Sequence, residues 1–97
     1  MKRTYYKTHL FNGSNAAADA AVLCAARQNG SSDPMSLESI AAIAKAENAP
    51  DTSFSMIDDH TLIIDAKQGG KYVEVCIIEQ IEVTALKETV DDLQEVF

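Results

Sequence analysis

Four carboxylates near the C-terminus have the spacing best suited to chemistry. They recur at intervals that place them on one face of a helix, at about 100° per residue. On a helix they would put four charges along roughly 10 Å, a density between those of a single DNA strand and of the duplex. Such a face offers ion-pair acceptors to lysine and arginine. The four residues are Glu88, Asp91, Asp92 and Glu95.

Further carboxylates could extend this negative surface. Asp58 and Asp59 are expected in a hairpin turn, and Glu79 and Glu82 precede the C-terminal segment. Like charges at helical spacing repel each other, and Lys87 is the one cation among the four C-terminal carboxylates. Two interpretations stay open at this point. The stripe is either a surface that binds a basic partner or the solvated side of an amphipathic helix.

The net charge of −7 is unevenly distributed along the chain. Residues 1–30 contain four Lys or Arg and one Asp, whereas residues 31–97 contain four Lys and fourteen Asp or Glu, which gives +3 and −10. The negative part repels phosphate and attracts basic surfaces. We therefore expect no direct binding of nucleic acid, because affinity for DNA comes mainly from Lys and Arg.

Other chemistry has little support in the sequence. The soft metal ligands His9, Cys24, His60 and Cys76 lack the short spacings of zinc sites. Neither cysteine has a histidine nearby in the sequence to activate it. Residues 69–71 (Gly-Gly-Lys) lack the rest of a phosphate-binding loop and fit a hairpin turn. We expect no metal, no cofactor and no catalytic residue, and hence a binding protein rather than an enzyme.

Both cysteines lie in apolar runs, which predicts buried free thiols and a reducing compartment. No segment reaches the roughly 18 apolar residues that a membrane span needs. The basic N-terminus leads into no apolar signal core. The expected location is the cytoplasm in which the protein is made.

The spacing of apolar residues and the positions of turn residues predict the helices and strands that position the candidate carboxylates. Residues 3–11 are rich in aromatic and β-branched residues and predict a strand. Ser14 or Asn15 can cap an alanine-rich helix that runs to about residue 29, where Gly30 ends it. Residues 37–48 predict a second helix.

After residue 53 the spacing of the apolar residues changes from a helical to a strand-like period. Three strands are predicted at residues 54–57, 60–67 and 71–79, joined by short turns. The last two are apolar on both faces, so we expect them in the middle of the sheet. After an unassigned junction, a final helix is predicted from Thr84 to about residue 96. Its apolar stripe comprises Leu86, Val90, Leu93 and Phe97.

These elements predict a single α+β domain, residues 1–97, with the order β-α-α-β-β-β-α. A small antiparallel sheet of three to four strands would have two to three helices packed on it.

The chain resembles the small anti-CRISPR proteins of phages and mobile elements in its length, its acidity and its lack of catalytic motifs. It is more narrowly similar to the DNA-mimicking inhibitors of the type I-F CRISPR surveillance complex, through the C-terminal carboxylates together with Asp58 and Asp59. The resemblance implies that the protein occupies the basic cleft between the large subunit and the backbone subunits, and so blocks target DNA in the bacterial host cell. The basic first third departs from a uniformly acidic mimic. We expect it to face away or to pack against the acidic part.

Two other functions fit the sequence. An acidic antitoxin, or an inhibitor of a restriction enzyme or nuclease, would use the same electrostatics against another basic protein. A small enzyme or ligand-binding domain would instead have a polar pocket that holds a group of perturbed pKa and is lined by His60 or Cys76.

Overall fold

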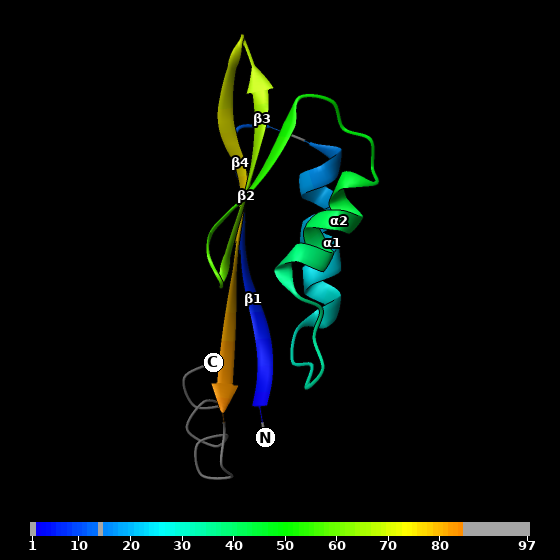
Figure 1. The fold of residues 1–97 in the computed structure, drawn as a ribbon, viewed down its shortest axis with the longest axis vertical. Coiled ribbons are helices and arrows are strands. Elements are labelled where there is room, and N and C mark those ends of the chain that lie inside the picture. Colours follow the sequence, from blue (N-terminus) through cyan, green and yellow to red (C-terminus); the bar gives the residue numbers. More distant parts are fainter. Residues whose placement is uncertain (1, 14, 85–97) are drawn as a thin grey trace.

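The computed structural model describes residues 2–13 and 15–84, which form a four-stranded antiparallel sheet and two helices. The strand order is β1-β4-β3-β2, and both helices cover the same face of the sheet (Figure 1). The predicted α+β class is confirmed, and so is the order of the first six elements. The predicted final helix lies outside the described residues except for its predicted first residue, Thr84, which instead ends the last strand. The elements are β1 (Lys2–Leu10), α1 (Ala16–Gln28), α2 (Leu37–Lys45), β2 (Thr52–Asp58), β3 (Thr61–Gln68) and β4 (Lys71–Thr84).

Capping side chains fix the start of each helix. The Asn15 side chain accepts a hydrogen bond from the Ala18 amide at 3.0 Å, and the Ser36 hydroxyl accepts one from the Ser39 amide at 3.1 Å. The end of α2 at Lys45 comes before the predicted residue 48. Asn48 has a φ of 54°, a left-handed conformation that does not continue a helix.

The core lies between the two helices and the sheet face that they cover. The buried positions of α1 are small residues, which let the helix approach its neighbours closely. Larger apolar side chains come from α2 and from the two central strands. Those with almost no exposed surface are Leu37, Ile40, Leu62, Ile64, Val75, Cys76 and Ile78.

The central strands β3 and β4 are those predicted for the middle of the sheet, but β4 is longer than predicted. Its predicted end at Glu79 is wrong, because the strand continues to Thr84. β3 pairs with β4 from Lys71 to Glu79, whereas β1 pairs with it from Cys76 to Thr84. Beyond Glu79, β1 and β4 therefore form a two-stranded ribbon.

The loop between the helices is fastened to the free edge of β1. The Gly30 amide donates to the Thr4 carbonyl at 2.7 Å, and the Thr4 amide donates to the Ser31 carbonyl at 3.0 Å. The Tyr6 hydroxyl donates to the Met35 carbonyl at 2.6 Å. Gly30 has a φ of 80°, which glycine adopts without strain. These contacts tie the basic first strand to the helical layer.

Candidate functional site

The sheet face turned away from the helices, here called the outer face, carries part of the predicted acidic surface. In one row across the four strands, Asp58 pairs with Thr61, Thr61 with Glu79, and Glu79 with Lys7. Side chains of directly paired residues point to the same face. Neighbouring strands lie about 4.8 Å apart, so the backbones at Asp58 and Glu79 are roughly 10 Å apart. Two predicted carboxylates thus share the last row of the four-stranded part of the outer face.

Asp58 also shapes the turn between β2 and β3. One of its carboxylate oxygens accepts a hydrogen bond from the His60 amide at 2.8 Å, the arrangement of an Asx turn. Asp59 and His60 are exposed in that turn. The two aspartates are therefore held at the surface, as the sequence predicts.

Glu82 lies on the opposite face from Glu79. It pairs with Thr4, which is buried on the helix side, and its carboxylate lies 3.7 Å from the Lys2 ammonium. Both side chains are at least half exposed, so this ion pair contributes at most about 1 kcal/mol. The other four predicted site residues, Glu88, Asp91, Asp92 and Glu95, lie outside the described residues.

The basic first third of the chain packs against acidic residues. β1 carries Lys2, Arg3 and Lys7 and is the antiparallel neighbour of β4. Lys7 faces Glu79 across the strands, and Lys2 contacts Glu82. Of the two expectations for this region, the one that places it beside acidic residues fits the register.

A second pair of carboxylates on the outer face is missed by the sequence analysis. Asp65 of β3 lies directly opposite Glu74 of β4, next to Ser53 of β2. One Asp65 oxygen is buried and has no hydrogen-bond partner among the described residues. The turn at Gly69-Gly70 contains the signal that could have identified the pair, because a two-residue turn fixes the register of the flanking strands.

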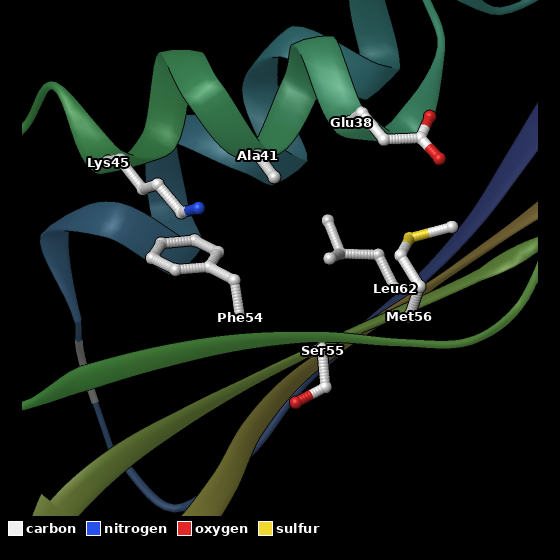
Figure 2. Close-up of a pocket in the computed structure, with 7 residues that line it drawn as sticks. All are labelled: Glu38, Ala41, Lys45, Phe54, Ser55, Met56 and Leu62. Carbon is white, nitrogen blue, oxygen red and sulfur yellow. The ribbon is translucent and has the colours of Figure 1, made fainter.

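A small open groove separates α2 from β2 and has a volume of about 140 Å³ (Figure 2). Ala41, Leu62 and Met56 form its apolar wall, and Glu38 stands toward one end. At the other end the Lys45 ammonium lies 5.3 Å from the centre of the Phe54 ring. Ser55 points away from the groove on the far side of β2 (Figure 2). Neither His60 nor Cys76 lines it.

The cysteines and histidines are not brought together. Cys24 and Cys76 are free and buried, as predicted. Burial, together with a smaller effect of the negative charge of Asp19, raises the pKa of the Cys76 thiol to about 11. His9 is exposed on β1, and no three His, Cys, Asp or Glu residues within the described ranges are placed to hold a metal.

Most carboxylates of the described part have no internal cation partner. Residues 2–84 contain eleven Asp and Glu, and among the described residues only Glu82 lies within 4.0 Å of a Lys or Arg nitrogen. These groups are available to accept hydrogen bonds and ion pairs from outside the molecule.

No family model, no curated protein and no solved structure matches this chain. None of its described helices is long and apolar enough to cross a membrane.

Proposed function

We propose that this protein is an acidic inhibitor that binds a basic nucleic-acid-binding surface of another protein and so excludes nucleic acid. The observation that carries the proposal is the shortage of internal cation partners for the carboxylates of the described part. Unpaired surface carboxylates attract a Lys- and Arg-rich cleft and can take the place of phosphates in it.

The outer face supplies such groups in two rows. Asp58 and Glu79 lie in one row, and Asp65 and Glu74 lie in the other. Two carboxylates placed directly opposite each other are unfavourable for the isolated sheet. A cationic group of the partner that inserts between Asp65 and Glu74 removes this repulsion. The repulsion that destabilises the free protein therefore favours formation of the complex.

The receptor that we propose is the type I-F surveillance complex with its guide RNA, in the cytoplasm of a bacterial host. This choice rests on the resemblance to DNA-mimicking anti-CRISPR proteins. The inhibitor would occupy the basic cleft between the large subunit and the backbone subunits. An antitoxin, or an inhibitor of a restriction enzyme or nuclease, would have the same charge pattern and a different receptor.

The proposal is tested with two variants that remove the same charge at different places. Asp58→Asn with Glu79→Gln neutralises one row of the outer face, whereas Glu38→Gln with Glu47→Gln neutralises two exposed positions in and just after α2. Binding to the purified complex is measured by biolayer interferometry, and thermal melts confirm that both variants fold. We expect the outer-face variant to dissociate about tenfold faster, since interface charges act mainly on the off-rate when they are desolvated.

The matched α2 variant should bind nearly as the original protein does. Equal losses in both variants would mean that net charge, and not the outer face, governs binding. Undiminished binding of the outer-face variant would exclude these carboxylates from the interface.

A further inference from the structure

One edge of the sheet, at β2, is open. β2 is the last strand in the order β1-β4-β3-β2, and β3 is its only sheet neighbour among the described residues. The β1 edge differs, because the loop between the helices bonds to Thr4 there. An open edge presents backbone N–H and C=O groups that can pair with a further strand. The β2 edge is therefore the place where the described sheet can be extended.

The backbone groups of Phe54 and Met56 point to this edge. The Lys67 amide of β3 donates to the Asp51 carbonyl at 2.8 Å, and the two strands keep one register as far as Met56. Residues of an antiparallel strand direct their backbone groups to either side in alternation. Because Asp51 points toward β3, the even-numbered residues of β2 up to Met56 point to the open edge.

The sequence of β2 lacks the residues that protect edge strands against pairing, which are commonly Lys, Pro or an inward-pointing charge. Residues 52–58 contain no Lys, Arg or Pro, and their single charged residue, Asp58, lies at the end of the strand. Phe54 and Met56 are apolar and pack partly against the core. The serines that alternate with them are small and uncharged. This strand is therefore suited to pairing with another strand.

A second copy of β2 fits this edge in an antiparallel register centred on Ser55. A two-fold axis at Ser55 places Phe54 opposite Met56 of the other copy, and both direct their backbone groups into the new ladder. The aromatic ring then meets a thioether, a contact that favours association. Ser55 meets its own copy on the outer face, where it is exposed and points away from the groove (Figure 2).

The charges of α2 match the same two-fold axis. The groove beside β2 has Lys45 at the end near Phe54 and Glu38 at the end near Met56 (Figure 2). The axis reverses this order in the second copy, so Lys45 of each chain lies beside Glu38 of the other. Ala42 is the exposed residue between them and leaves room for the two helices to approach. This charge complementarity favours a second copy of the chain over an unrelated strand.

We propose that two copies of the protein pair through their β2 strands and form one continuous antiparallel sheet of eight strands, four from each copy. The strand, its apolar pair and the charges of α2 are all self-complementary about one axis. The helices of both copies lie on one face of the joined sheet, and both outer faces stay open. The dimer thus presents each carboxylate row twice, and its formation does not depend on the proposed inhibitory function.

Sedimentation equilibrium of the full chain tests the dimer. We expect the mass to approach about 21 kDa, twice the 10.5 kDa of one chain, at about 100 µM protein. Ser55→Lys should weaken dimerisation about tenfold or more, because it places two lysines opposite each other at the axis. The matched control, Ser32→Lys, makes the same change at an exposed loop position and should dimerise as the original protein does. Thermal melts confirm that both variants fold.

Cysteine variants test the register. Ser55→Cys should form an intermolecular disulfide under mild oxidation, because directly opposed residues of neighbouring strands lie about 4.5–5.5 Å apart. Ser53→Cys should not, because its two copies would lie roughly 13 Å apart along the strands. Electrophoresis without reducing agent separates the linked dimer from the single chain.

A mass of 10.5 kDa at every concentration would overturn the proposal, and so would a dimer that Ser55→Lys leaves unchanged. Cross-linking through Ser53→Cys and not through Ser55→Cys would overturn the register. None of these measurements involves a receptor or nucleic acid, so this proposal and the proposed function fail separately.

Discussion

At the scale of single residues, Asp65 and Glu74 form a pair whose mutual repulsion lowers the stability of the sheet. The two carboxylates face each other across β3 and β4, and one Asp65 oxygen is buried without a hydrogen-bond partner in the described part of the chain. Directly opposed like charges destabilise an antiparallel pair. A sequence under selection for stability alone would place a cation at one of these positions, as it does at Lys7 opposite Glu79.

Replacing one member of this pair should therefore stabilise the protein. In Glu74→Lys the repulsion becomes an attraction, and we expect a gain of about 0.5–1 kcal/mol in the free energy of unfolding. This corresponds to a rise of roughly 2–6 °C in the melting temperature, which calorimetry measures. Glu74→Gln should gain about half as much. A lower melting temperature for Glu74→Lys would show that Glu74 has a stabilising contact that the register does not reveal.

The buried thiol of Cys76 should make the protein less stable as the pH rises into the alkaline range. Its folded-state pKa of about 11 lies above the ordinary value of 9.0, because burial disfavours the thiolate. The contribution of this thiol to the free energy of unfolding is complete below pH 9 and is lost as the pH rises toward 11, because the thiol of the unfolded chain loses its proton first. We expect a loss of roughly 1–3 kcal/mol over this range in urea unfolding experiments. Cys76→Ala should lack this part of the pH dependence. An equal slope in both proteins would contradict the assignment.

At the scale of elements, local signals predict the helices and the central strands, and long-range pairing decides the rest. Asn15 and Ser36 mark helix starts through their capping chemistry. The apolar runs of β3 and β4 predict the middle of the sheet. The length of β4 could not be predicted, because residues 80–84 are a strand through pairing with β1, which is distant in sequence.

The N-cap residue of α1 tests directly whether a capping side chain stabilises the start of this helix. Asn15→Ala removes the side-chain acceptor for the Ala18 amide, and we expect a loss of about 1 kcal/mol in unfolding free energy. Asn15→Asp keeps an acceptor and adds a negative charge at the helix N-terminus, so it should retain the stability. Chemical denaturation of the three proteins measures the difference. Equal losses in both variants would point instead to the weaker contact between the Asn15 amide and the Thr52 hydroxyl at 3.4 Å.

At the scale of the whole molecule, the charge imbalance was readable from the sequence but its distribution over the faces was not. Glu79 and Glu82 are near neighbours in sequence, yet a spacing of three residues on a strand places them on opposite faces. Asp58 and Glu79 are distant in sequence and share a row only because β3 lies between them. The number of carboxylates can be counted in the sequence, whereas strand register decides which of them lie on the same face of the sheet.

An order-of-addition experiment tests most directly the proposed competition between the protein and nucleic acid for one basic surface. A type I-F surveillance complex with its guide RNA is incubated with this protein, and matched double-stranded DNA is then added. A parallel sample receives the DNA first. We expect preincubation with the protein to abolish DNA binding, and DNA added first to slow binding of the protein.

Both effects should weaken as salt rises, because the screening length falls from about 10 Å at 0.1 M to about 3 Å at 1 M. The protein alone should not shift DNA in a gel at about 50 mM salt. Asp91→Lys with Asp92→Lys should weaken the inhibition without unfolding the protein. Simultaneous and undiminished binding of protein and DNA to the same complex would contradict the claim.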